Sequence, residues 1–124
     1  MTQEDRNLLL KDLCSRLPYN VVIRCTDNDT DYKCFLTTGI LNELLHNTEY
    51  YDYKPYLRPM SSMTEKEEKI FNDFLEFQAE YVSDADLYNK TDMYDWLIAH
   101  HFDYRGLIEK GLALEAPADM YKTS

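Results

Sequence analysis

The chain has few of the residues that build phosphate-binding loops, metal sites and membrane spans. Only 3 of its 124 residues are glycine, and the motifs of nucleotide-binding enzymes, zinc proteases and serine hydrolases do not occur. Its three cysteines, Cys14, Cys25 and Cys34, form no CxxC pair. No apolar run approaches the roughly 20 residues that span a bilayer. We therefore predict no catalytic, cofactor-binding or metal-binding residue, and no membrane partner.

Basic residues are also in the minority. The 13 lysines and arginines face 23 aspartates and glutamates, which gives a formal net charge of −10. The basic residues are scattered from Arg6 to Lys122 without a cluster. Because an acidic surface repels a phosphate backbone, this composition predicts no direct nucleic-acid partner.

The remaining composition is that of a packed globular protein. Hydrophobic residues make up 44% and aromatic residues 14% of the chain. A length of 124 residues is enough for one hydrophobic core, so we expect a single domain over 1–124. The first residues lack the basic segment and long apolar core of a signal peptide, and the odd number of cysteines suits a reducing compartment. These features predict a cytoplasmic location.

Hydrophobic periodicity predicts an α+β fold. Thr2 is expected to cap an N-terminal helix, and the period then changes to the alternation typical of strands. We expect a small antiparallel sheet of three to four strands across 20–58, either open or curled into a small barrel. Two to three C-terminal helices should follow, near 64–82, 92–101 and 104–113.

The caps of these later helices can be read from the sequence. Thr64 and Glu67 have the spacing of a capping box at the start of the 64–82 helix. Residues 83–91 are polar and are expected to form a loop. Thr91 is then expected to cap the 92–101 helix.

A β-hairpin is the clearest strand prediction. If Asp29 and Thr30 form a two-residue turn, paired residue numbers sum to 59 and Cys25 lies opposite Cys34. The two thiols would then be neighbours on a buried face. Reduced, packed cysteines are favoured over a disulfide in a reducing compartment, and whether the two pair is left open.

Two segments suggest an interaction surface. The stretch 50–56 is rich in tyrosine, which is enriched at protein interfaces, and Pro55 indicates an edge strand. The segment 64–86 carries eight acids and two lysines, so it could imitate a phosphate backbone. The bland alternatives are an aromatic layer that closes a sheet and a solvated helix face. The candidate interaction residues are Tyr50, Tyr51, Tyr53, Tyr56, Glu67, Glu68 and Glu76.

His100 and His101 are the best candidates for a metal site, with Asp103 nearby. Adjacent side chains on a helix point about 100° apart, so they do not converge on one ion as zinc ligands do. His100 lies on the same helical face as Trp96 and Leu97. We therefore favour a partly buried packing role, with a small metal-dependent enzyme as the alternative.

Three blocks carry a resemblance to known sequences: LLLKDLCSRLPY at 8–19, KPYLRPMSSMTEKE at 54–67 and HHFDYRGLIEKGLALEAPADMY at 100–121. Together they resemble an uncharacterised family of small hypothetical proteins from human-gut bacteria and their phages and mobile elements. The resemblance implies no activity, cofactor or catalytic residue. It implies a setting, that of a phage-related accessory protein in a bacterial cytoplasm.

These features favour a non-enzymatic accessory protein that acts by binding another protein. The alternatives are an acidic inhibitor that mimics nucleic acid and a metal-dependent enzyme that uses the His100/His101 region. A homo-oligomer is also compatible with the sequence.

Overall fold

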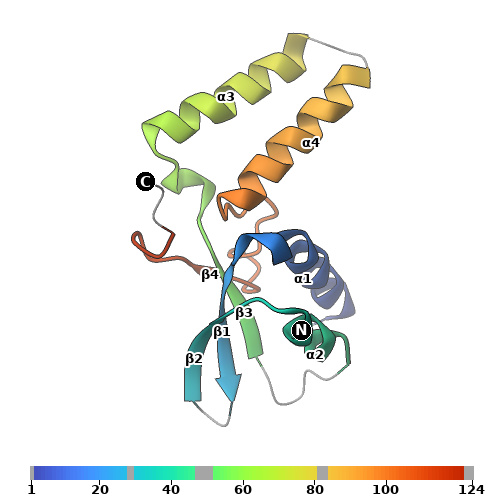
Figure 1. Cartoon of the computed structure of the whole chain (residues 1–124), viewed down its shortest axis with the longest axis vertical. Helices are drawn as coiled ribbons and strands as arrows, with labels where there is room; N and C mark the ends of the chain where they lie inside the picture. Colours follow the sequence, from blue (N-terminus) through green and yellow to red (C-terminus); the bar gives the residue numbers. More distant parts are fainter. Residues whose placement is uncertain (1, 28–29, 47–51, 81–83, 122–124) are drawn as a thin grey trace.

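The computed structural model describes residues 2–27, 30–46, 52–80 and 84–121 and shows an α+β fold. An N-terminal helix, a four-stranded sheet and two long C-terminal helices are present, as predicted (Figure 1). No helix in these ranges is long and apolar enough to cross a membrane. The elements, including two 3₁₀ turns, are α1 (Gln3–Arg16), η1 (Leu17–Tyr19), β1 (Val22–Asp27), β2 (Thr30–Phe35), α2 (Thr38–His46), β3 (Asp52–Leu57), η2 (Met60–Ser62), α3 (Glu65–Glu80), α4 (Asp84–Ala99) and β4 (Leu114–Glu115).

The sheet is open, which is one of the two predicted forms, and mixed, which corrects the expectation of a purely antiparallel sheet. Its strand order is β2-β1-β3-β4. β1 pairs antiparallel with β2 and with β3, whereas β3 pairs parallel with β4. The short strand β4 follows both long helices in the chain and lies beside β3, running in the same direction. Its two residues, Leu114 and Glu115, pair with Tyr56 and Leu57.

The hairpin is confirmed, but its predicted register is wrong by two residues. Val22 lies opposite Phe35, so the paired numbers sum to 57 and not 59. The last pair is Asp27 with Thr30, and residues 28–29 between them lie outside the described residues. A shift of two keeps every side chain on its predicted face, because the side-chain period of a strand is two. Cys25 now lies opposite Tyr32, and its Sγ is 2.8 Å from the Sγ of Cys34 as a diagonal neighbour.

Two hydrophobic clusters hold the molecule together. α1 and α2 pack on one face of the sheet, with a core that includes Leu9, Leu13, Ile23 and Leu57 (Figure 1). α3 and α4 lie side by side at the other end of the molecule, around Phe102, Met93 and Leu97. Each fully buried aliphatic side chain of this kind contributes about 1.5–3 kcal/mol to folding.

A buried ion network joins the two clusters, and nothing in the sequence analysis singled it out. Asp12 and Arg16 lie one helical turn apart on α1, both fully buried, with the Arg16 Nε 2.6 Å from Asp12 Oδ2. Arg16 Nη2 also donates to the Phe102 carbonyl oxygen at 2.7 Å, and Arg105 Nε donates to Asp12 Oδ1 at 3.1 Å. Asp12 is thus shared between α1 and the segment after α4.

Two predictions for the C-terminal half are wrong. Residues 84–91 are helical and belong to α4, so Thr91 lies inside that helix and does not cap it. Residues 104–113 form turns and not a helix. There the Asp103 carboxylate accepts hydrogen bonds from the N–H groups of Leu107 and Ile108, both at 2.9 Å. Gly106 (φ 74°) and Gly111 (φ 75°) lie in the left-handed region, which ends any helical run.

Candidate functional site

The outer face of the sheet, turned away from α1 and α2, carries a group of basic and aromatic side chains. Alternation along β1 places Val21, Ile23 and Cys25 in the core. The residues between them, Val22 and Arg24 among them, face outward and are half-buried. Residues paired directly across an antiparallel ladder share a face, so the outer face can be read from the register.

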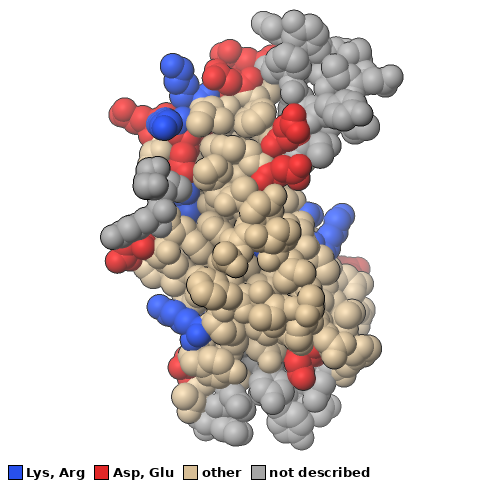
Figure 2. Space-filling view, viewed as in Figure 1, with Lys and Arg blue, Asp and Glu red and all other residues tan. Residues whose placement is uncertain are grey.

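Three positive side chains form a row across three neighbouring strands. Arg24 on β1 lies opposite Lys33 on β2 and opposite Lys54 on β3. Figure 2 shows Lys and Arg atoms at the lower left of the molecule, where β2 lies in Figure 1. Like charges directly opposite one another repel across a sheet.

Aromatic side chains flank the positive row. Phe35 on β2 is 60% exposed although it is fully apolar. On β3, Tyr56 is half-buried, and the Lys33 ammonium lies 5.4 Å from its ring centroid. A cation at this distance from a tyrosine ring is attracted by about 0.5–1 kcal/mol when exposed. The row therefore has an aromatic border on the side of Phe35 and Tyr56.

The row of positive charge ends at an open edge of the sheet. In the strand order, β2 is the outermost strand and pairs with β1 alone among the described residues. Five of its six residues are exposed, and Cys34 is the exception. Tyr32, on the same strand, is 46% exposed. An exposed edge strand of this length offers backbone N–H and C=O groups to an incoming strand.

The tyrosine residues predicted as an interaction surface have different locations. Tyr50 and Tyr51 lie outside the described residues. Tyr53 is only 7% exposed and belongs to the core, so it is not part of a surface. β3 is an interior strand and not an edge, because β4 pairs with its end from Tyr56 onward. Pro55 is tolerated there because it precedes the residues that pair with β4. Of the two tyrosines that are described, Tyr56 takes part in the outer face and Tyr53 does not.

The acidic residues also separate into two kinds. Glu68 and Glu76 are exposed on α3, whereas Glu67 is 6% exposed and structural. It forms the predicted capping box with Thr64, and Arg58 binds its carboxylate at 2.7 and 2.9 Å. The hydrogen bonds from Arg58 are the main cause that lowers the pKa of Glu67 to about 2. Around α3, Figure 2 shows acidic and basic side chains intermixed, which breaks up an acidic surface.

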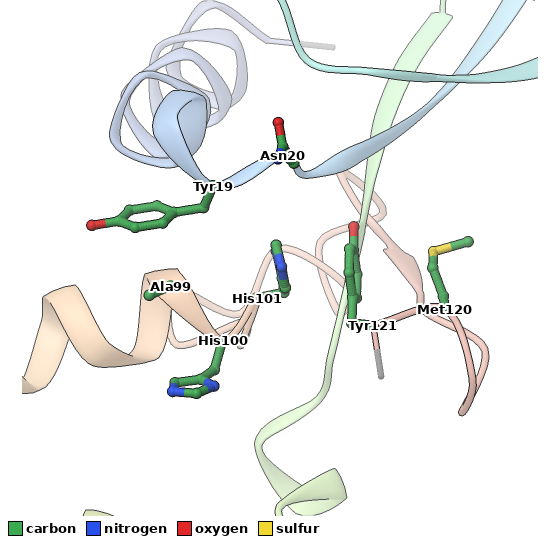
Figure 3. A pocket seen from close by; sticks show the side chains of 7 residues that line it. All are labelled: Tyr19, Asn20, Ala99, His100, His101, Met120 and Tyr121. Atoms are coloured by element: carbon green, nitrogen blue, oxygen red, sulfur yellow. The ribbon is translucent and has the colours of Figure 1, made fainter. Parts of the chain in front are cut away.

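The histidines do not form a metal site with their neighbours. The His100 ring packs against Trp96 in a tilted arrangement, with centroids 4.8 Å apart and 51° between the planes, which agrees with its predicted packing role. The His101 ring instead stacks on Tyr121, with centroids 3.7 Å apart. Figure 3 shows the two imidazoles on opposite sides of the chain. Within the ranges described, no three His, Cys, Asp or Glu side chains are grouped so that they could hold a metal ion.

The positive row could not be found by scanning the sequence for basic clusters. Its members are 9 to 30 positions apart along the chain, and only strand pairing brings them together. The predicted hairpin register also hid it, because a sum of 59 places Arg24 opposite Phe35 and not Lys33. Correct register was the missing signal.

Comparison with known proteins adds no family to these observations: no protein-family model, no curated protein and no solved structure matches the chain. The resemblance to small proteins of gut bacteria, phages and mobile elements therefore stays a prediction. The chemistry of the outer face is argued from this structure alone.

Proposed function

We propose that this chain is a non-enzymatic binding protein that captures an extended, acidic segment of a partner protein along the open edge of β2. The single observation that supports this most is the row Lys33–Arg24–Lys54, which runs across the sheet and ends at that edge. A strand added beside β2 extends the row by one residue. An aspartate or glutamate at that position lies beside Lys33, which is exposed on β2.

The aromatic border sets the second requirement on the partner. Phe35 lies two residues from Lys33 on the same strand and therefore on the same face. A partner residue opposite Phe35 covers an apolar ring that is now 60% exposed. The preferred segment is thus an extended one, with an acidic residue and an apolar residue two positions apart.

A protein strand fits this surface better than nucleic acid does. A strand satisfies the backbone groups at the β2 edge, which a nucleotide chain does not reproduce. A long phosphate chain would also meet the rest of a molecule whose net charge is −10. Binding to single-stranded nucleic acid through the positive row and the aromatic rings is therefore the competing outcome of the test.

The wider setting belongs to the same proposal. A cytoplasmic accessory protein of a phage or mobile element, as the sequence resemblance implies, would act through such a binding surface. The version in which the acidic helix mimics nucleic acid has less support, because Glu67 is held by Arg58 and exposed lysines, Lys66 and Lys69, interrupt the acids of α3.

Selection from a displayed library of random extended peptides tests the proposal. Wild-type protein should enrich peptides with alternating Asp or Glu and apolar residues. The Lys33→Glu variant should instead enrich Lys or Arg, and Phe35→Ser should lose enrichment. Lys69→Glu makes the same charge change on an exposed position of α3 and is the matched control, expected to select the wild-type set.

Three results would count against the proposal. One is the same peptide set for wild type and Lys33→Glu. Another is tighter binding of a single-stranded oligonucleotide than of the selected peptides. The third is a stable dimer, seen by light scattering, that the Lys33→Glu substitution dissociates. In such a dimer the β2 strands of two copies pair antiparallel, and Asp31 of each copy lies beside Lys33 of the other. A second copy of the chain would then occupy the edge.

A further inference from the structure

A second surface feature, separate from the sheet edge, lies at the C-terminal end of α4. It is a hollow of about 370 Å³, within the usual range for small-molecule sites. It lies between the end of η1, the end of α4 and the C-terminal segment (Figure 3). Seven residues line it: Tyr19, Asn20, Ala99, His100, His101, Met120 and Tyr121.

The backbone at His101 is held in a conformation that favours glycine. After α4 ends, the His101 N–H donates to the Ile98 carbonyl at 3.0 Å and the Phe102 N–H donates to the Leu97 carbonyl at 2.9 Å. This pair of hydrogen bonds is a Schellman motif. The residue one position past the C-cap, which adopts the left-handed conformation, is usually glycine in this motif. Here that residue is a histidine with φ 67°. The side chain therefore carries a conformational cost that glycine would remove.

The His101 imidazole forms one wall of the hollow. One face of the ring is stacked on Tyr121, at 3.7 Å between centroids and 13° between planes. In Figure 3 the His101 ring lies between Tyr121 and Tyr19, so its other face is turned toward Tyr19 across the hollow. Tyr19 is 37% exposed and bounds the opposite side.

The protonation of His101 can be inferred from burial. Its Nδ1 is buried without a hydrogen-bond partner. A buried acceptor without a partner is tolerated better than a buried N–H, so the proton belongs on Nε2. Burial, and after it the positive charge of Arg16, lowers the pKa of His101 to about 4. Burial also lowers the pKa of His100, so both imidazoles are neutral near pH 7.

We propose that this hollow binds an uncharged, planar heteroaromatic ring, which stacks on the face of His101 away from Tyr121. None of the seven lining residues is Asp, Glu, Lys or Arg, so the site offers no partner for a charged ligand. Stacking of the ring extends the existing His101–Tyr121 pair to three layers, with Tyr19 closing the open side.

Ligand-observed NMR with adenine as the probe, on the full chain at neutral pH, tests this site. We expect saturable binding with a dissociation constant below about 1 mM. His101→Gly should weaken it at least tenfold while the fold is kept, because glycine suits the left-handed position. Tyr19→Ala is the second variant and should weaken binding without altering α4. Tyr94→Ala removes an aromatic ring of similar exposure, 42%, from another surface and should leave binding unchanged.

The proposal is overturned if adenine does not saturate, if both His101→Gly and Tyr19→Ala bind it as wild type does, or if a non-planar ring such as cyclohexanecarboxamide binds equally well. The Lys33→Glu variant should bind adenine normally. This separates failure of the hollow from failure of the β2 edge.

Discussion

The Arg58 guanidinium holds the Glu67 carboxylate by two hydrogen bonds, from Nη2 to Oε1 at 2.7 Å and from Nη1 to Oε2 at 2.9 Å. Both side chains are largely buried, and the guanidinium also lies 4.1 Å from the centroid of the Phe102 ring. The pair therefore ties β3 to the start of α3 and to the second hydrophobic cluster. Glu67 was predicted as part of an interaction surface, but its side chain is largely buried and links two parts of the fold.

Removal of this carboxylate should weaken the fold in a defined pH range. Because Arg58 lowers the pKa of Glu67 from 4.5 to about 2, the ionised form stabilises the native state above pH 4.5. This contribution is lost as the pH falls from about 4.5 toward 2. At neutral pH, Glu67→Gln should lower the free energy of unfolding by about 2 kcal/mol in urea titrations. Glu68→Gln, exposed one residue later, should stay within about 0.5 kcal/mol of wild type, and equal effects would refute the ion-pair account.

Loss of the Tyr121 hydroxyl should lower the free energy of unfolding at least as much as loss of one backbone hydrogen bond between strands. It accepts from the Val22 N–H at 2.7 Å and donates to the Tyr56 carbonyl at 2.8 Å, so it bridges β1 and β3 just beyond their paired residues. Tyr121→Phe leaves both backbone groups without this partner and should cost about 2 kcal/mol in thermal or urea unfolding. Tyr94→Phe, on an exposed ring, is the control. A change of less than about 0.5 kcal/mol in Tyr121→Phe would show that water replaces the hydroxyl.

His101 should give stability a second pH dependence, at higher pH than Glu67. A histidine whose pKa falls from 6.5 to about 4 on folding resists protonation in the native state. The unfolded chain then binds more protons between these values, so stability falls as the pH drops from about 6.5 to 4. In His101→Gly the loss over this range should shrink by on the order of 1 kcal/mol. His46→Asn, at an exposed position, should show the wild-type slope, and identical slopes for all three proteins would contradict the assignment.

The cysteines should differ sharply in reactivity. Burial, and next the hydrogen bond to Cys34, raises the pKa of Cys25 to about 12, so almost no thiolate forms near pH 8. Cys14 is exposed on α1. Mass spectrometry after iodoacetamide treatment should find Cys14 modified first and Cys25 protected in the native protein. All three should react in urea, and early modification of native Cys25 would contradict the buried placement.

Much of the fold could be predicted because local signals agreed with tertiary packing. The Thr2 cap, the Thr64–Glu67 capping box and the two strands of the hairpin are all present. The hairpin register was wrong because two adjacent positions, Asn28–Asp29 or Asp29–Thr30, both suit a two-residue turn, and a shift of two preserves the apolar face.

The failures occurred where specific hydrogen bonds or distant strands, and not the apolar spacing, decide the local structure. The apolar spacing of 107–112 is typical of a helix, but the Asp103 carboxylate caps a turn there instead. β4 has only two residues and forms because Tyr56 and Leu57 lie beside it. The outer positive row and the hollow depend on segments far apart in the chain, so no local pattern could reveal either.

Amide hydrogen exchange by NMR, on the protein saturated with a selected acidic peptide, tests the central claim most directly. If the peptide adds as a strand, the amides of 30–35 that point away from β1 should gain at least about tenfold protection, while those of α3 stay unchanged. Unchanged protection on β2, or protection confined to α3 or to the His101 hollow, would contradict the proposal that the β2 edge is the binding site.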